Sequence, residues 1–434
     1  MREGFFDRDG VRLHYLDWDP EEAPDARAVE PIVFLHGLSS NARFWARVAE
    51  RLPGRRMLAL DQRSHGLSDR PASGYTHEEL TADAAALFDH ARLGRALVVG
   101  HSWGAAIALE LAAARPDLVS GLVFIDGPVA SMSEVLTWEQ AQQVMQPALP
   151  FYGSLEEAVA AKRKDLEWGR SWGDDLVPFV AAGLAATEGG FVLTLNEPVR
   201  FRILKELFHY HPELLWAQVD CPVAVLLAES DTPFGRWKRR SEETLRELRP
   251  EADIRWFRSP HDIPIHLPQE TARELERLSL RAGFADVARD ASVLVAGDWS
   301  RPTLDSDWDA HDLLAHISST QGALVATVAS AVPAAEPAAA PAAVAGAGQS
   351  GPREPFDPDR WNASQVRRRR ERSVADLVAE IAEGTAAFDE AVQAADLGRT
   401  VTIGRFAGRP LAEALKGLLD HQRNHMSELR AALA

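Results

Sequence analysis

The strongest constraint on the fold of this 434-residue chain is a serine flanked by glycines, Ser102, in the sequence Gly-His-Ser-Trp-Gly. The apolar run Ala96–Val99 precedes it, and an alanine-rich, helix-forming segment follows it. A G-x-S-x-G pattern between a strand and a helix is typical of a sharp turn that holds a serine hydroxyl clear of a sheet. The glycines allow the tight turn. We therefore predict that Ser102 is a nucleophile at the end of a buried strand.

The first half of the chain alternates short apolar runs with helical patterns, which indicates an α/β fold with a mostly parallel sheet. Residues Gly4 to Trp18, interrupted by Asp9-Gly10, predict a leading hairpin. The runs that predict buried strands are Pro31–Leu35, Arg56–Leu60, Ala96–Val99, Val119–Ile125, Val223–Ala228 and Ile254–Phe257. Ligands of such sheets bind beyond the carboxyl ends of the strands, so polar residues at those ends are candidates for chemistry.

A serine hydroxyl becomes nucleophilic when a base takes its proton, and that base needs a carboxylate to hold its tautomer. His261 follows the last predicted strand and is the expected base, with His266 as the competing candidate. Asp231 ends the preceding strand, and we expect it to be the acid because the order Ser, Asp, His suits this motif. Asp126, which ends the strand after the nucleophile, is the alternative acid.

The predicted oxyanion hole consists of two backbone amides. One belongs to Trp103, directly after the nucleophile, and the other to Leu38, in the turn after the first parallel strand. In this hypothesis Ser102 attacks a carbonyl and the two amides hold the negative oxygen. His261 then moves the proton to the leaving group and takes the next one from water.

These residues resemble the α/β-hydrolase superfamily over about residues 4–282. The resemblance includes His36-Gly37, the loop Asp61–Ser68 and the stretch His261–Pro264, and it departs from the usual pattern at Ser64, where family members commonly carry glycine. A serine at the elbow is similar to esterases, lactonases, thioesterases and carbon–carbon hydrolases. The resemblance thus implies a serine hydrolase of an ester, thioester, lactone or related acyl substrate, with carboxylic ester hydrolysis favoured and no cofactor in this domain.

Between about residues 128 and 217 the strand pattern gives way to helical stretches rich in aromatic residues. This change predicts a helical cap inserted into the hydrolase domain. Most of its aromatic residues are expected to form core, and the others favour a small apolar substrate.

From residue 283 onward the chain consists of amphipathic helical segments, near 286–296, 310–329, 373–394 and 411–432. Four such segments predict an all-α four-helix bundle over residues 283–434, after a hydrolase domain over residues 1–282. An Ala- and Pro-rich segment at about 331–353 predicts a flexible loop within the bundle.

Three histidines of this region form a candidate metal site. His421 and His425 are four residues apart on one face of the last helix, and a bundle can bring His316 from a facing helix to them. The region resembles the DinB-like bundle superfamily, which includes the mycothiol-dependent maleylpyruvate isomerase metal-binding domain. The stretches that carry this resemblance are Trp308–His316, Trp361–Val366 and His421–His425. The resemblance implies that His316, His421 and His425 bind a divalent metal, zinc or nickel, in thiol-dependent transferase or isomerase chemistry.

A formal net charge of −17 argues against nucleic acids and acidic membranes as partners, because both are bound through Lys and Arg. The run Arg367–Arg370 is expected to be a solvated helix face. A single cysteine, Cys221, excludes an internal disulfide and is expected to be a buried, unreactive side chain. With no secretory signal pattern and no apolar stretch of membrane-spanning length, we expect a cytoplasmic protein.

Two functional hypotheses follow. In the first, the protein is a serine hydrolase with an accessory metal-binding bundle. In the second, the bundle is the main catalyst, a metal-dependent transferase or isomerase that uses a low-molecular-weight thiol, and the hydrolase domain has a supporting role. A bundle that only mediates interactions or adds stability is a third interpretation.

Overall fold

The computed structural model describes residues 1–18, 30–146, 148–231, 233–294, 297–303, 308–331 and 357–434. These residues form two compact units, Met1–Ala282 and Gly283–Ala434, and each unit is described by itself. The Ala- and Pro-rich segment expected at 331–353 lies, apart from its first residue, outside the described residues.

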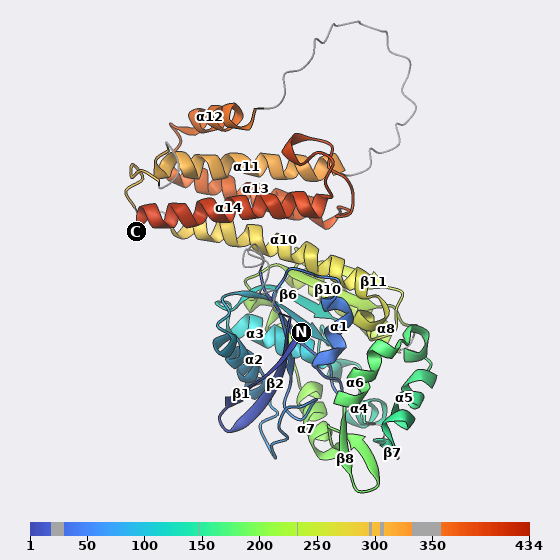
Figure 1. Cartoon of the computed structure of the whole chain (residues 1–434). Helices are drawn as coiled ribbons and strands as arrows, with labels where there is room; N and C mark the ends of the chain where they lie inside the picture. Colours follow the sequence, from blue (N-terminus) through green and yellow to red (C-terminus); the bar gives the residue numbers. More distant parts are fainter. Residues whose placement is uncertain (19–29, 147, 232, 295–296, 304–307, 332–356) are drawn as a thin grey trace, which may run out of the picture. The chain divides into compact units, whose positions relative to one another are not determined.

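An eight-stranded sheet forms the centre of the first unit, in the order β1-β2-β4-β3-β5-β6-β10-β11 (Figure 1). The pairs β1/β2 and β2/β4 are antiparallel and the others are parallel. The strands are β1 Arg2–Arg8, β2 Val11–Trp18, β3 Ile32–Leu35, β4 Met57–Asp61, β5 Ala96–His101, β6 Val119–Ile125, β10 Val223–Ala228 and β11 Asp253–Phe257. The leading hairpin turns at Asp9 and Gly10, which both have positive φ. The predicted α/β fold class is confirmed.

Helices cover both faces of this sheet, which explains why its inner strands are continuous apolar runs. One face packs against α2 and α3, and the other against the short helix η1, α1, α9 and α10. The helices of this layer structure are η1 Ala42–Trp45, α1 Ala46–Ala49, α2 His77–Ala91, α3 Trp103–Ala114, α8 Pro233–Leu248, α9 Ile263–His266 and α10 Pro268–Val293. The carboxyl ends of the parallel strands stay uncovered by these helices and carry the site described below.

The cap lies between β6 and β10, and Figure 1 shows its elements grouped on one side of the first unit. Its main helices are α4 Trp138–Met145, α5 Leu155–Lys164, α6 Val177–Ala182 and α7 Glu197–Phe208. It also contains a three-stranded antiparallel sheet of β7 Phe151–Tyr152, β9 Gly190–Leu193 and β8 Leu184–Thr187. The cap is thus mainly helical, as expected, and this small sheet is an addition that the sequence pattern did not predict. Gly189, with a φ of 82°, makes the tight turn that pairs two strands too short to give an alternating sequence pattern.

The second unit is helical. It holds the C-terminal part of α10 and the helices α11 Ala310–Ala331, α12 Pro358–Arg369, α13 Val374–Gln393 and α14 Leu411–Leu433, with a short turn η7 at Gly404–Phe406. The helix α11 packs against α12, α13 and α14 (Figure 1). None of the four expected helical segments corresponds to α12, because its mostly polar composition gives no clear periodic signal. In the described part of the chain, none of the helices combines the length and apolarity that a bilayer span requires.

The arginine run at the end of α12 is only partly solvated. Arg369 makes a bidentate pair with Glu380 on α13, at 3.0 and 2.6 Å, and Arg370 makes one with Asp312 on α11, at 3.1 and 2.9 Å. The expectation of a solvated face is wrong for Arg369, whose side chain is 17% exposed, whereas Arg370 keeps 62% of its side chain exposed while it pairs with Asp312. Arg367 and Arg368 are exposed.

Candidate active site and metal centre

Ser102 lies in the turn between β5 and α3. Its backbone, with φ 54° and ψ −120°, is in a region that residues other than glycine rarely adopt. The flanking glycines make this turn sterically feasible. A Cβ atom at Gly100 would lie 2.4 Å from the carbonyl oxygen of Gly104, and one at Gly104 would lie 2.4 Å from the carbonyl oxygen of His36. The chain therefore makes the strained strand-to-helix turn that its sequence predicts.

His261, in the loop after β11, contacts a carboxylate. Its Nδ1 lies 2.6 Å from Oδ2 of Asp126, which directly follows β6 and is 4% exposed. The same Oδ2 accepts a hydrogen bond from Nζ of Lys238 at 2.7 Å, and Oδ1 accepts one from the backbone amide of Ala228 at 2.8 Å. Three donors thus hold one buried carboxylate, and the imidazole is one of them.

The carboxylate that contacts His261 is not the expected Asp231. Asp231 is exposed, and no hydrogen bond or ion pair among the described residues joins it to His261. The partner of His261 is Asp126, the alternative in the sequence analysis. Both aspartates follow parallel strands that end at the same edge of the sheet, so position along the chain did not separate them. The competing base His266 contacts Oγ of Ser171 at 2.8 Å, and no carboxylate of a described residue forms a hydrogen bond or ion pair with it.

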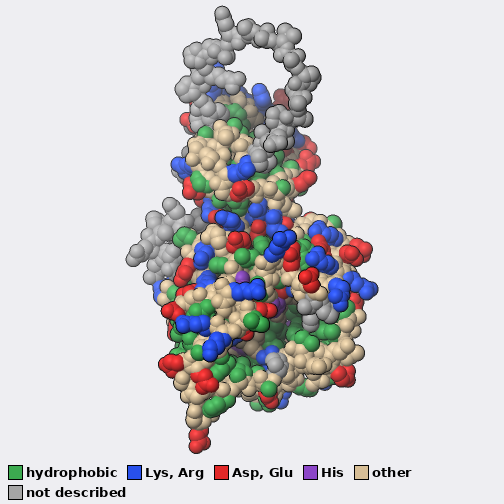
Figure 2. All heavy atoms as spheres, turned by 90° about the vertical axis from the view of Figure 1, so that its right-hand side faces the viewer, with side chains coloured by type: hydrophobic (Ala, Val, Ile, Leu, Met, Phe, Trp, Pro, Cys, Tyr) green, Lys and Arg blue, Asp and Glu red, His purple; other side chains and the backbone are tan. Residues whose placement is uncertain are grey.

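Asp126 and His261 each favour the charged form of the other. Burial raises the pKa of Asp126, but the hydrogen bond and charge of His261, together with Lys238, outweigh it and the pKa is lowered. Burial also lowers the pKa of His261, but the hydrogen bond and charge of Asp126 outweigh it and the pKa is raised. The His261 side chain is 47% exposed, and Figure 2 shows histidine side chains at a hollow in the surface of the first unit. Asp126 is therefore ionised at neutral pH and stabilises a protonated imidazole.

The turn after β3 approaches the nucleophile closely. A Cβ atom at Gly37 would lie only 3.1 Å from Cβ of Ser102. Leu38 is the next residue, and the backbone amide of Ser39 after it donates to Nε2 of His65 at 3.1 Å, which anchors the turn. Trp103, the other expected amide donor, begins α3 and is buried. The turn that contains Leu38 thus lies beside Ser102, and Trp103 follows Ser102 directly in the chain.

The loop after β4 contains Ser64, a position at which the sequence departs from the usual family pattern. Asp61 accepts hydrogen bonds from the backbone amides of Ala42 and Leu67, at 2.6 and 2.9 Å. Ser64, which stands where the family commonly has glycine, has a φ of 67°. Glycine adopts this conformation without strain, whereas serine here is held by a hydrogen bond of 2.5 Å between its Oγ and the hydroxyl of Tyr75. The loop therefore keeps a turn that normally requires glycine.

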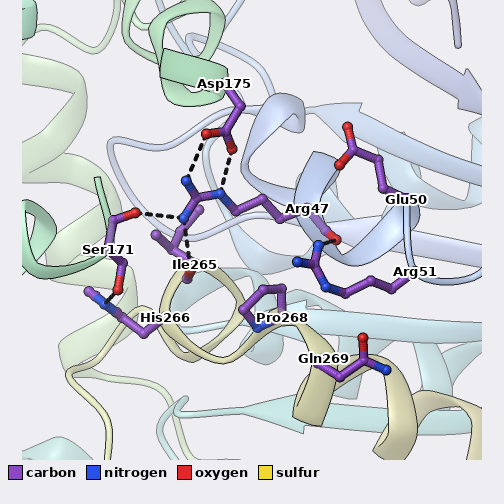
Figure 3. A pocket seen from close by; sticks show the side chains of 9 residues that line it. All are labelled: Arg47, Glu50, Arg51, Ser171, Asp175, Ile265, His266, Pro268 and Gln269. Atoms are coloured by element: carbon purple, nitrogen blue, oxygen red, sulfur yellow. Dashed lines mark hydrogen bonds and ion pairs between the residues drawn. The ribbon is translucent and has the colours of Figure 1, made fainter. Parts of the chain in front are cut away.

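A cavity of about 570 Å³ lies beside α1 and α9 in the first unit, and none of the proposed catalytic residues lines it (Figure 3). At its centre, Arg47 donates to the carboxylate of Asp175 at 2.5 and 2.9 Å and to the carbonyl oxygens of Ser171 and Ile265 at 2.8 and 3.1 Å. Its guanidinium thus connects the core of the unit to the cap. Because Asp175 already neutralises this arginine, the cavity indicates a structural joint rather than a catalytic pocket.

The three histidines of the second unit converge. His316, on α11, and His421, on α14, have their Nε2 atoms 3.0 Å apart, and one ligand atom from each of His316, His421 and His425 lies within 4.8 Å of the others. Burial and mutual repulsion lower the pKa of His316 to about 3, and burial with repulsion from His425 and Arg405 lowers that of His421 to about 4. All three are therefore neutral at pH 7, the form that ligates metals.

Two further observations fit a cation at this place. His316 is 2% exposed, and its buried Nδ1 has no hydrogen-bond partner among the described residues. Nδ1 of His425 lies 3.5 Å from the carboxylate of Glu428, the outer contact that commonly orients a metal-bound imidazole. The donor set suits zinc or nickel, because imidazole nitrogens are ligands for both.

Other groups that the sequence singled out have structural roles. Cys221 is buried, and burial raises its thiol pKa to about 12, as expected for an unreactive side chain. Asp309, His311 and Asp312 form a second cluster of possible ligands. However, Nε2 of His311 contacts the carbonyl oxygen of Arg372, and Asp312 is paired with Arg370. This second cluster is therefore occupied by protein partners.

Comparison with family models gives two matches. Residues 30–176 match the alpha/beta hydrolase fold, and residues 280–418 match the Mycothiol maleylpyruvate isomerase N-terminal domain. Both families are those that the sequence resembles, so the two expected resemblances are confirmed.

Among curated proteins, the chain is 42% identical over 96 residues to 2-(acetamidomethylene)succinate hydrolase of Mesorhizobium japonicum, covering 22% of this chain and 34% of the relative. It is 36% identical over 133 residues to Lipase LipV of Mycobacterium tuberculosis, covering 31% of this chain and 49% of the relative. The chain thus spans about a third to a half of the length of these relatives.

A solved structure, the thioesterase domain from the curacin biosynthetic pathway, superposes with a TM-score of 0.52 at 18% identity, covering 63% of this chain and 99% of that domain. The crystal structure of E-2-(acetamidomethylene)succinate hydrolase superposes with a TM-score of 0.51 at 22% identity, covering 63% of this chain and 99% of that one. At these identities the likeness shows the fold.

Proposed function

Because the chain joins a region of the α/β-hydrolase fold family, residues 30–176, to a mycothiol maleylpyruvate isomerase N-terminal domain, residues 280–418, we propose that it is a serine hydrolase with an accessory metal-binding bundle. The proposed triad is Ser102, His261 and Asp126. The observation that carries the proposal is the contact of 2.6 Å between Nδ1 of His261 and Asp126, at the sheet edge where the strained turn presents Ser102.

In the proposed mechanism, Oγ of Ser102 attacks the acyl carbon while Nε2 of His261 takes its proton. The negative oxygen that forms is held by the amides of Leu38 and Trp103. His261 then passes the proton to the leaving group, which departs and leaves an acyl-serine. A water molecule then loses a proton to His261 and attacks the acyl carbon, and His261 returns that proton to Oγ of Ser102 as the acyl–serine bond breaks. Asp126 stabilises the protonated imidazole in both halves.

We propose a small acyl compound as the substrate, an ester, thioester or lactone, with carboxylic ester hydrolysis as the class to test first. The relatives support this choice, because a lipase and a succinate-derivative hydrolase are among them. We also propose that the substrate carries an apolar group, in line with the aromatic-rich composition of the cap.

Labelling with a fluorophosphonate probe and peptide mapping tests the proposal, because the probe reacts only with an activated serine. Labelling confined to Ser102, abolished in Ser102→Ala and strongly slowed in His261→Gln, is the expected result. Labelling at another serine, or equal labelling in His261→Gln, would refute the assignment. The buried Ser120→Ala variant is a matched control, because its serine lies within β6 and should not react.

For the second unit we propose a divalent-metal site at His316, His421 and His425, favoured by their convergence within 4.8 Å. A bound metal would supply Lewis-acid chemistry and lower the pKa of a thiol ligand, in line with the proposed use of a low-molecular-weight thiol. The three imidazoles would hold the ion, and Glu428 would orient His425. Metal content of the purified protein, measured by mass spectrometry, should fall from about one ion per chain to background in His421→Ala.

The same variant separates the two functional hypotheses. If the hydrolase is the main catalyst, His421→Ala should lose its metal and keep its esterase activity. If the bundle is the main catalyst, a thiol-dependent transferase or isomerase activity should be present in the metal-loaded protein and absent in His421→Ala, whatever Ser102→Ala does.

A further inference from the structure

A lysine that no hydrolase motif predicts lies against the proposed acid. Lys238, on α8, has a side chain only 10% exposed, and its Nζ lies 2.7 Å from Oδ2 of Asp126. This is the same oxygen that Nδ1 of His261 contacts at 2.6 Å. Nζ also lies 3.3 Å from the carbonyl oxygen of Ala228, at the end of β10. The ammonium group is therefore fixed between two neighbouring strands, in contact with the acid of the triad.

A buried ammonium group is costly unless it is paired, and here its charged partner is the acid itself. The pair of Asp126 and Lys238 carries no net charge, so the proton that His261 accepts during the reaction makes the buried cluster positive. With an unpaired aspartate the same proton would make the cluster neutral. Lys238 therefore opposes protonation of His261, while its hydrogen bond fixes the carboxylate that orients the imidazole.

We propose that Lys238 is a positioning residue of the hydrolase, which holds Asp126 in place and offsets part of its charge, so that His261 loses its proton at a lower pH than it would beside an unpaired aspartate. The inference rests on the proposed triad. It assigns to Lys238 a role in the base form of His261, beyond filling space beside Asp126.

The charged groups around His261 act on its pKa in opposite directions, and Lys238 is the one that the test removes. Asp126 and Asp262 favour its protonation, and Lys238 disfavours it. The ring of His101 lies 4.7 Å from that of His261, but burial first, then the nearby His261, lowers the pKa of His101 to about 4, so His101 stays neutral above pH 5.

The expected size of the effect follows from the distances. Because Nζ of Lys238 and Nδ1 of His261 both lie within 2.7 Å of one oxygen, they are separated by about 5 Å or less. At this separation, and with the screening expected for a half-exposed imidazole, removing the positive charge should raise the pKa of His261 by about one unit.

The test is the pH dependence of kcat/KM for a p-nitrophenyl ester in Lys238→Met, which has a similar length and no charge. The acidic limb of the profile should move up by about one pH unit. Lys238→Gln, which keeps a hydrogen-bond donor without the charge, should move it by a similar amount, and Lys238→Arg should restore the wild-type position. Lys164→Met, at an exposed lysine, is the matched control and should leave the profile unchanged.

An acidic limb at the wild-type pH in both neutral variants would overturn the proposal, even if the plateau falls, because a purely structural role lowers the plateau alone. If Lys238→Met does not fold, the Gln and Arg variants decide by the same criterion. Ser102→Ala, assayed in parallel, separates the two levels of inference. If it keeps the esterase activity the triad itself is wrong, and if it loses that activity an unmoved limb refutes only the role of Lys238.

Discussion

Replacement of Asp126 by asparagine tests the central contact of the proposed active site. Asparagine has the shape of aspartate, but it offers one acceptor oxygen where the carboxylate offers two. The structure requires both, because Oδ1 accepts from the amide of Ala228 and Oδ2 accepts from His261 and Lys238. In either orientation of the amide, the NH₂ group of asparagine faces a hydrogen-bond donor, with which it cannot form a hydrogen bond. His261 therefore loses either its tautomer or its alignment.

The loss should be large. In serine hydrolases, the same substitution of the triad aspartate lowers kcat by about 10⁴, which corresponds to about 5 kcal/mol of transition-state stabilisation. The variant also leaves the buried ammonium of Lys238 without a counter-charge, so its free energy of unfolding should fall by about 3–5 kcal/mol. Activity should thus be measured well below the lowered melting temperature.

The assay is kcat/KM for an activated ester at the pH optimum, with Asp231→Asn as the matched control. Asp231 is exposed and has no contact with His261 among the described residues, so its variant should stay within about twofold of wild type. A loss of 10³ or more in Asp231→Asn, with little change in Asp126→Asn, would refute the assignment of the acid and restore the order of the sequence motif.

Four further predictions rest on the same structure. Since the charge of Asp126 outweighs burial and raises the pKa of His261, kcat/KM should fall on the acidic side of a pKa above the ordinary value of 6.5; activity that persists well below pH 6 would contradict this. Because the pKa of His261 is higher in the folded than in the unfolded protein, the contact between His261 and Asp126 stabilises the fold fully below the unfolded pKa. This stabilisation is lost as the pH rises through the folded pKa, and thermal unfolding at pH 6 and pH 9 checks it. Gly104→Ala should abolish labelling of Ser102 and destabilise the protein, because the new Cβ atom would lie 2.4 Å from backbone oxygens that cannot move aside; an active, stable variant would show that the turn is looser than described. Removing a bound metal with a chelator should lower the melting temperature of the wild type and leave that of His316→Ala unchanged; equal shifts in both would place the metal elsewhere.

Local patterns of the sequence predicted much of the fold. The turn at Ser102 is signalled by a five-residue motif, in which Gly100 lies against Gly104 and Ala105 of the same turn. Gly104 itself lies against the backbone of Leu35 and His36 at the end of the adjoining strand. The buried strands were identifiable because helices on both faces require apolar side chains at every position. The small sheet of the cap and the helix α12 were missed, because strands of two to four residues and a helix with few apolar residues leave no periodic signal.

Local patterns of the sequence predicted the strand-to-helix turn at Ser102, a histidine after the last strand and three histidines on helices, because each of these features depends on residues close together in the chain. Which carboxylate meets His261 depends instead on how the strands pack into the sheet. Asp126 and Asp231 both follow parallel strands, and their distances from the histidine depend on the order β5-β6-β10-β11 and on the loop after each strand. The place of Lys238 has the same origin. It is one charged residue among many on α8, and only the packing of that helix beside β10 brings its ammonium group to Asp126, where burial and shared hydrogen bonds give it influence over the base.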